Sequence, residues 1–464
     1  MSLSRVLVAN RGEIAVRVIN ACRRMGIETV AVVSDADRKS LPALMADRVV
    51  CIGPARSSAS YLNANAIITV ASAVGADAIH PGYGFLAENA AFAQLCGESG
   101  IIFIGPPAAC ISDMGNKLKA REIAAAEGVP LAQGSNNVRT VGDAERVAEE
   151  VGYPVLLKAA AGGGGRGIRV VREPRDLRSA FESASAEALS SFGDNAMFIE
   201  RYIENARHIE VQVLADQQGQ VVHLGDRDCS PQRRYQKMVE EALATDLPDS
   251  LRDEMYEAAT TLTRKIGYRN AGTVEFIVDQ DRSEFYFMEM NTRIQVEHPV
   301  TEMVTGVDIV EQQIRIAAGE PLAFGQKDIA FNGHAIEVRV NAESPLHGFR
   351  PSPGKITRWT LPEGEGVRVD SHCYEGYLIP PFYDSLMAKV IVWGADREAA
   401  IARMVSALDS FDVEGVDTTI PFLRYTLRRE TFSRRPVNTR WLEQVAEEFL
   451  RDSSTGRAVR RSAS

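Results

Sequence analysis

The chain has 464 residues, of which 45% are hydrophobic, and carries a formal net charge of −10. That length exceeds what one hydrophobic core normally serves, so we expect two or three domains. The negative charge argues against general nucleic-acid binding. No apolar run approaches a membrane span and no secretion signal opens the chain, so we expect a cytoplasmic protein with no nucleic acid and no membrane as partner.

The first hundred residues predict alternating strands and helices. Residues 5–10 and 29–33 have the composition of strands, and residues 13–25 between them form an amphipathic helical pattern that ends before Gly26. Such a βαβ opening is typical of a parallel sheet with helices on its faces. We expect this N-terminal domain to occupy residues 1–113.

A glycine-rich loop between two strands follows. Residues 153–158 and 168–171 read as strands, and the loop between them contains four consecutive glycines at 162–165. A Walker loop or a dinucleotide fingerprint would lead into a helix, whereas this loop leads into a strand. Because glycine lets backbone amides approach phosphate oxygens, the pattern favours a flap that closes over a triphosphate, with Lys158 at its base. A hairpin tip without function is the alternative.

Two later strands predict a metal site. Residues 272–279 and the stretch that begins at Phe287 are separated by a polar loop, so their pairing would set Glu275 roughly opposite Glu289. Facing carboxylates repel unless a proton or a cation bridges them, which predicts magnesium at Glu275, Glu289 and Asn291. An extended strand would also place one set of alternating polar side chains on a single face: Glu289, Asn291, Arg293, Gln295 and Glu297. The alternative is an edge strand with solvated charges.

The last third of the chain predicts a region of short strands and one helix. Residues 335–340 and 387–393 read as strands, and residues 397–408 as a helix. We expect a C-terminal domain at 332–447. The remaining residues 448–464, which are rich in serine and arginine from Arg451 onward, predict a disordered tail.

The six cysteines show no metal-binding or disulfide pattern. They are scattered without a Cys-x-x-Cys pair, so neither zinc nor a disulfide framework is indicated. Cys229 lies among the charged motifs. We interpret it as an inert, partly buried thiol, with sensitivity to oxidation as the alternative.

Several motifs in order, spread from about Arg5 to about Glu447, resemble those of the biotin carboxylases of the ATP-grasp superfamily. They are the glycine-rich hairpin and residues 8–14, 80–86, 198–203, 227–237, 289–299, 350–354 and 381–385. The resemblance implies an α/β and α+β multidomain fold. Its parts are a parallel-sheet N-terminal domain, an ATP-grasp domain at 114–331 with a flap subdomain at about 131–203, and a mixed β-rich C-terminal domain.

The resemblance also implies roles for individual residues. Those that match nucleotide-binding positions are Lys117, Lys158, Gly164, Gly165, Glu200, Ile203, His208, Gln232 and Tyr235. Those that match ligands of Mg²⁺, or Mn²⁺ in its place, are Glu275, Glu289 and Asn291. Bicarbonate would be held by Lys237, Arg293 and the Val296 backbone, with Glu297 as its base. Arg339 would stabilise the enolate of biotin, and Tyr83 lies in a segment near the biotin pocket.

The implied reaction is the carboxylation of biotin with ATP and bicarbonate through carboxyphosphate. It would be the first half-reaction of an acetyl-CoA or acyl-CoA type carboxylase, and the family further implies a homodimer. No Ala-Met-Lys-Met-like motif that could carry biotin occurs in the chain. The biotin would therefore belong to a separate biotin carboxyl carrier protein, and a carboxyltransferase subunit would complete the system.

Two departures from the family pattern and two other functions remain open. Tyr235 stands where many members have histidine, and Ala161 where a fifth glycine is common. Tyrosine cannot become cationic near neutral pH, so a nucleotide contact there would differ. One alternative function is a ligase that passes an acyl phosphate to an amine, as carbamoyl-phosphate synthetase does. The other is a catalytically silent subunit that senses nucleotides.

Overall fold

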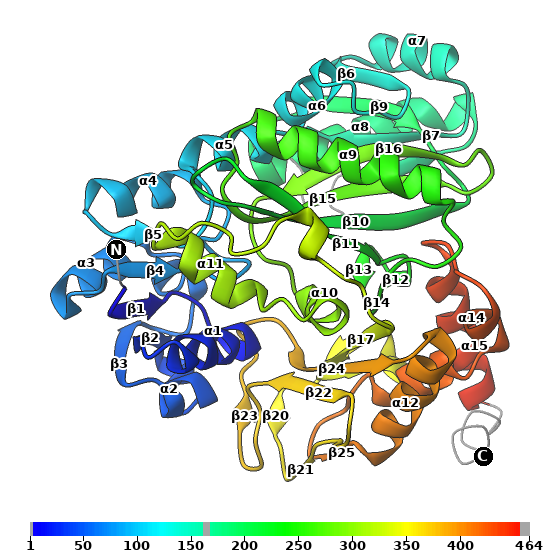
Figure 1. The fold of residues 1–464 in the computed structure, drawn as a ribbon. Helices are drawn as coiled ribbons and strands as arrows, with labels where there is room; N and C mark the ends of the chain where they lie inside the picture. The colour runs from blue at the N-terminus through cyan, green and yellow to red at the C-terminus, as the bar shows by residue number, and fades with distance from the viewer. Residues whose placement is uncertain (1–2, 161–167, 455–464) are drawn as a thin grey trace.

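The computed structural model describes residues 3–160 and 168–454 (Figure 1). Gly164, Gly165 and Ala161 lie outside these residues, so the predictions for the tip of the glycine-rich loop stay predictions. In Figure 1 the N-terminal segments, in blue, lie on one side of the molecule. The segments around residues 134–200, in cyan, form the top, and the C-terminal segments, in orange and red, form the lower right.

The N-terminal region contains the predicted parallel sheet, with the strand order β3-β2-β1-β4-β5 and parallel pairing throughout. Its strands are β1 (Arg5–Val8), β2 (Glu28–Ser34), β3 (Arg48–Gly53), β4 (Ala78–His80) and β5 (Ile102–Phe103). Its helices are α1 (Gly12–Arg24), α2 (Leu41–Met45), α3 (Ala64–Val74), α4 (Ala90–Glu98) and α5 (Ala108–Gly115). The first strand ends at Val8, earlier than predicted. Beyond it, the side chain of Asn10 donates hydrogen bonds to the carbonyls of Pro81 and Tyr83.

The flap subdomain is a separate antiparallel sheet with the order β6-β9-β7-β8. Its strands are β6 (Gly134–Val138), β7 (Val155–Ala159), β8 (Ile168–Val171) and β9 (Met197–Arg201), and its helices are α7 (Val141–Val151) and α8 (Pro174–Phe192). The pairing of β7 with β8 confirms that the glycine-rich loop joins two strands. Helix α7 begins at Val141 because Thr140 and Asp143 form a reciprocal capping box.

One eight-stranded sheet forms the centre of the molecule, with the order β16-β15-β10-β11-β14-β17-β24-β22. Its strands are β10 (Ala206–Ala215), β11 (Val221–Asp228), β14 (Val239–Ala242), β15 (Asn270–Asp279), β16 (Glu284–Asn291), β17 (His334–Asn341), β22 (Val367–Ser371) and β24 (Leu386–Gly394). The pairing of β14 with β17 carries this sheet across the expected boundary near residue 332. The ATP-grasp and C-terminal regions therefore share one sheet, which holds residues from both at fixed distances.

Further helices surround this sheet, and the short strands pair with one another in separate two-stranded sheets. The helices are α6 (Lys117–Ala126), α9 (Asp249–Lys265), α10 (His298–Thr305), α11 (Ile309–Ala317), α12 (Arg397–Ser410), α13 (Ile420–Leu427), α14 (Glu430–Arg434) and α15 (Trp441–Ser454). The short strands are β12 (Gln232–Arg233), β13 (Gln236–Lys237), β18 (Glu343–Ser344), β19 (Arg350–Pro351), β20 (Gly354–Lys355), β21 (Arg358–Thr360), β23 (Leu378–Ile379) and β25 (Asp412–Glu414). Among the described residues, no helix is both long and apolar enough to cross a membrane.

The predicted tail was wrong for its first part, because α15 continues to Ser454. Val445 and Phe449 of this helix are buried in the core of the C-terminal region. The hydroxyl of Tyr425 also donates a hydrogen bond of 2.7 Å to Asp452. An amphipathic face thus overrides the polar composition of these residues. Residues 455–464 lie outside the described part.

A shared hydrophobic core fixes the N-terminal region against the central sheet. Val6 and Ile14 of the N-terminal region pack in the same cluster as Leu214, Leu224 and Ile314 of the central one. Residues from both regions can therefore line one cleft with a defined geometry.

Candidate active site

A cavity of about 1140 Å³ lies where the N-terminal region, the flap subdomain, the central sheet and the C-terminal helix α15 meet. Every described residue that was predicted from the sequence to form the site lines this cavity: Tyr83, Lys117, Lys158, Glu200, Ile203, His208, Gln232, Tyr235, Lys237, Glu275, Glu289, Asn291, Arg293, Val296, Glu297 and Arg339. Many of these residues lie far apart in the chain. The cleft thus unites the predicted nucleotide, metal and bicarbonate residues in one place.

The strand register predicted for the metal residues is confirmed. Glu275 of β15 lies opposite Glu289 of β16, and Asn291 ends the second strand. The amide nitrogen of Asn291 donates a hydrogen bond of 2.7 Å to Glu275, while Lys117 Nζ lies 3.6 Å from Glu289 Oε2. Two carboxylates and an amide oxygen are the hard ligands that magnesium prefers, so this set fits the ion.

The alternation expected beyond Asn291 was wrong, because β16 ends there and the chain turns. Glu297 directly precedes helix α10, whose first turn contains Pro299. Proline suits the first turn of a helix, where its missing N–H leaves no bond unmade. Arg293 therefore reaches the site from a turn, where its guanidinium donates to Glu88 at 2.7 Å and to the Asn291 amide oxygen at 2.9 Å.

Lys237 lies at the centre of a buried group of carboxylates. Its ammonium contacts Glu210, Glu297 at 2.8 Å and Glu275 at 3.2 Å. Burial by itself would lower the pKa of Lys237, but the three carboxylates outweigh it and raise this pKa well above the ordinary value. The surrounding carboxylates therefore favour the positively charged form of this lysine.

Glu297 is buried but ionised. Burial would raise its pKa, yet the positive charges of Lys237 and Arg339 bring the pKa of Glu297 down to about 2. Lys237 binds one oxygen of this carboxylate, and the guanidinium of Arg339 donates to the other at 3.0 Å. The carboxylate therefore stands between two cations in the form that can accept a proton.

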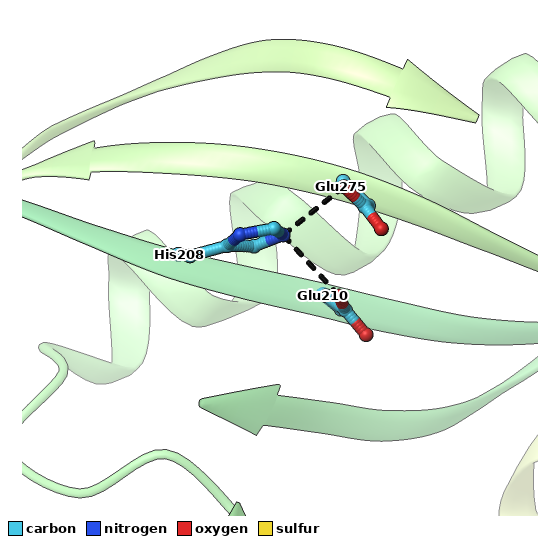
Figure 2. Close-up of side chains that lie close together, drawn as sticks. All are labelled: His208, Glu210 and Glu275. Atoms are coloured by element: carbon cyan, nitrogen blue, oxygen red, sulfur yellow. Dashed lines mark ion pairs between the residues drawn. The ribbon is translucent and has the colours of Figure 1, made fainter. Parts of the chain in front are cut away.

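His208 forms a second cationic contact with the same acids. Figure 2 shows its ring between Glu210 and Glu275, at 3.2 and 3.1 Å from Nε2. Although burial opposes protonation, the charge of Glu275 raises the pKa of His208 to about 9. The three side chains could offer ligands to a metal ion. A protonated His208 has no Nε2 lone pair to offer a metal ion, and its charge and that of Lys237 balance the two carboxylates, so we interpret the cluster as a set of charge pairs.

Several residues predicted to bind the nucleotide lie toward the flap. Lys158 forms an ion pair with Glu200, which also lies 3.2 Å from the guanidinium of Arg121. Tyr235 is 57% exposed and sits with Arg234 at the tip of the β12–β13 hairpin. Both tip residues have positive φ, the conformation of a two-residue hairpin turn. The hairpin thereby presents the tyrosine ring to the cavity.

Two buried acids were missing from the sequence prediction. Glu210 contacts both Lys237 and His208, and Glu240 accepts a hydrogen bond of 2.6 Å from Arg339. Glu210 alternates with His208 along β10, so the period-2 pattern was a signal that could have identified it. Glu240 gave no such signal, because its partner comes from a strand distant in the chain.

Cys229 is fully buried, and burial raises the pKa of its thiol well above the ordinary value. This supports the interpretation as an inert thiol. The other cysteines of the chain are also unpaired.

Three models of known protein families match consecutive parts of the chain. Family models described as the biotin carboxylase N-terminal domain, the carbamoyl-phosphate synthase L chain ATP-binding domain and the biotin carboxylase C-terminal domain match residues 2–111, 116–324 and 337–444. Together these models span nearly the whole chain.

Curated relatives share about half of the sequence. Biotin carboxylase 1 of Bacillus subtilis is 53% identical over 95% of this chain and 98% of its own length. A pyruvate carboxylase subunit of Methanothermobacter thermautotrophicus is 51% identical, over 95% of this chain and 90% of its own. The 2-oxoglutarate carboxylase small subunit of Hydrogenobacter thermophilus is 52% identical, over 96% and 94%.

Solved structures of biotin carboxylases have the same fold as this chain. The biotin carboxylase domain dimer of the Hydrogenobacter thermophilus 2-oxoglutarate carboxylase, in complex with MgADP, ADP and bicarbonate, superposes with a TM-score of 0.93. It is 50% identical, covering 97% of this chain and 99% of that one. The biotin carboxylase of Campylobacter jejuni, in a β,γ-ATP complex, also gives a TM-score of 0.93 at 47% identity, over 96% and 99%.

Proposed function

Since this chain belongs to the biotin carboxylase family and is an ATP-dependent enzyme of that kind, we propose that the acids around Lys237 organise its reaction. The reaction joins bicarbonate to biotin at the expense of ATP, through carboxyphosphate. The observation that carries the assignment of roles is the contact of one buried carboxylate, Glu297, with both Lys237 and Arg339.

Glu297 is the proposed general base that deprotonates bicarbonate. It is ionised, and it is held by two cations, Lys237 and Arg339. Both of these cations would also attract an incoming anion. When Lys237 shares its charge with bound bicarbonate, Glu297 loses part of its stabilisation and becomes a stronger base. Arg293, Lys237 and the Val296 backbone would hold the bicarbonate in line with the terminal phosphate of ATP.

The phosphate end would be formed by Lys117, Lys158 and the metal ligands. The two lysines offset negative charge as the phosphoryl group moves. Mg²⁺, bound by Glu275, Glu289 and Asn291, would supply further charge neutralisation at the phosphate oxygens. Glu200 and Ile203 lie toward the flap, where they line the expected adenine end, and Tyr235 and Gln232 line the same cavity.

Arg339 is the proposed partner of the biotin enolate. Its guanidinium lies in the cavity and is kept cationic by Glu240 and Glu297, which raise its pKa despite burial. A fixed cation of this kind suits an enolate oxygen. Tyr83 lines the same cavity from the N-terminal region.

The relatives named above include subunits and domains of larger carboxylases. We extend this to a biotin carboxyl carrier protein and a carboxyltransferase as partners of this chain, and to a homodimer like that of the solved relative. Relatives named for pyruvate and for 2-oxoglutarate are as similar as those named biotin carboxylase. An acyl-CoA acceptor and a cytoplasmic location stay predictions.

The deciding experiment measures ADP release with ATP, Mg²⁺ and bicarbonate, with and without free biotin, while labelled bicarbonate is followed into carboxybiotin. We expect label in biotin together with ADP. Release of ADP without labelled biotin would indicate an amine or another acceptor, as in carbamoyl-phosphate synthesis. Nucleotide binding with no release would contradict the proposal, because it would indicate a silent subunit.

A further inference from the structure

Lys389 is a completely buried lysine that touches the backbone beside the proposed base. Its ammonium donates a hydrogen bond of 2.8 Å to the carbonyl of Val296. This carbonyl belongs to the peptide bond that joins Val296 to Glu297. Lys389 lies directly opposite Arg339 in the pairing of β24 with β17, so both side chains leave the same face of the sheet. The lysine therefore reaches the peptide bond between Val296 and Glu297 from the strand that pairs with the strand of Arg339.

The bond to Val296 is the shortest polar contact of this ammonium. Glu13 lies at 3.2 Å and Asp370 at 3.7 Å, and Asp370 is also held by two hydrogen bonds from Arg368. If Lys389 served only to neutralise the charges of Glu13 and Asp370, its ammonium would not need to donate a hydrogen bond to a carbonyl. A buried charged hydrogen bond restrains its acceptor more strongly than a neutral one, so it fixes the orientation of this peptide plane.

Glu13 connects the lysine to the surface of the cleft. The same oxygen that faces Lys389 accepts a hydrogen bond from the hydroxyl of Tyr83. The second oxygen of Glu13 is buried without a hydrogen-bond partner among the described residues. Tyr83 is partly exposed and lines the cavity. A continuous chain of polar contacts thus runs from the cleft surface through Glu13 and Lys389 to the carbonyl of Val296.

We propose that Lys389 is a positioning residue for the carboxylation reaction, which holds Val296 and Glu297 in the geometry that binds bicarbonate, and that Tyr83 supports it through Glu13. This inference rests on the proposed function. It assigns the three residues no contact with the reacting atoms. Their loss should raise the bicarbonate requirement and leave the ATP requirement unchanged, because the nucleotide end of the cleft has other contacts.

The test measures bicarbonate-dependent ADP release by the full chain, without biotin, for Lys389→Met, Tyr83→Phe, Glu13→Gln and the Tyr83→Phe/Glu13→Gln double variant. We expect the half-saturating bicarbonate concentration to rise about tenfold in Lys389→Met, as expected for a lost charged hydrogen bond. It should rise about threefold in Tyr83→Phe, for a weaker bond. The double variant should match Glu13→Gln, because Tyr83 acts through Glu13.

Matched controls are Lys355→Met and Tyr425→Phe, whose parent residues do not line the cavity. An equal rise in the ATP requirement, or effects of Tyr83→Phe and Glu13→Gln that multiply, would overturn the inference. If Lys389→Met does not fold, an unchanged bicarbonate requirement in Tyr83→Phe decides against it. A parent protein without bicarbonate-dependent release would instead refute the proposed function itself.

Discussion

The two ends of the cleft differ in how completely the protein neutralises its own charges. At the proposed bicarbonate end, Glu297 is 2% exposed and both of its oxygens contact a cation. At the proposed phosphate end, Lys117 and Glu289 are 25% and 36% exposed, and their closest atoms are 3.6 Å apart. Glu297 is thus held in place in the folded chain, whereas Lys117 and Glu289 leave room for groups that the substrate and metal bring.

This difference follows from the chemistry of the two ligands. Bicarbonate is small and carries a single charge, so the protein must hold its catalytic groups in place beforehand. A nucleotide triphosphate with its metal brings several charges of its own, and a fully paired site would have to break those pairs to admit it. We therefore expect substitution of Glu297 or Arg339 to lower the rate, and substitution of Glu289 to shift the requirement for a ligand.

The largest effect is expected for Glu297→Gln. Glutamine keeps the size of the side chain but replaces the carboxylate base with an amide. Bicarbonate-dependent ADP release should therefore fall about 10²–10⁴-fold, the usual contribution of a general base. ATP binding, measured by calorimetry, should be unchanged. Glu447→Gln, on the exposed face of α15, is the control. A large loss of ATP affinity in Glu297→Gln would mean that the two ends are not independent.

Glu241, which pairs with Arg397 and His334 outside the cleft, tests how much charge pairing contributes to the stability of the fold. Burial opposes its ionisation, but hydrogen bonds from His334 and Arg397 lower the pKa of Glu241 to about 2 from its ordinary 4.5. The folded state therefore binds this proton more weakly than the unfolded state, and the pair stabilises the protein above about pH 4.5. The contribution, about 3 kcal/mol, is lost as the pH falls toward about 2.

Free energies of unfolding at pH 7 and pH 3 measure this. The parent should lose more stability than Glu241→Gln over that range, and the catalytic rate at pH 7 should differ little between folded samples. Parallel losses in both proteins would show that other acids dominate the acid sensitivity.

Arg339→Ala separates the two steps of the reaction at the bicarbonate end. Carboxylation of biotin should fall about a hundredfold, because the enolate loses a charge-assisted partner. Bicarbonate-dependent ADP release should fall less, since Lys237 still holds Glu297. The measurement is the ratio of labelled carboxybiotin to ADP, with Arg358→Ala as control. An unchanged ratio would contradict the assignment of Arg339 to biotin.

The smallest effect is expected for Glu289→Gln. One carboxylate of the metal set becomes an amide, so the half-saturating Mg²⁺ concentration should rise about tenfold while the maximal rate at high Mg²⁺ is largely restored. Glu284→Gln, at the exposed start of the same strand, is the matched control. A reduced maximal rate with normal Mg²⁺ dependence would contradict the assignment of Glu289 as a metal ligand.

Local patterns in the sequence predicted much of the site. The two-residue period of β15 and β16 and the short loop between them predicted the hairpin that brings Glu275 close to Glu289, although a register shift beside Glu275, which the pattern did not reveal, sets the exact pairing. The βαβ pattern predicted the parallel sheet, and the glycines between two strands predicted the flap hairpin. Each of these features depends on neighbours in the chain, which is why sequence alone could determine them.

Tertiary structure decided the rest, because periodicity specifies which face a side chain takes but not which strand lies beside it. The end of β16 at Asn291 moved Arg293 and Glu297 from a strand to a turn. The order β14-β17-β24 brought Glu240 to Arg339 and aimed Lys389 at Val296. These contacts join residues far apart in the chain, and they form only when the whole sheet and its buried charges assemble together.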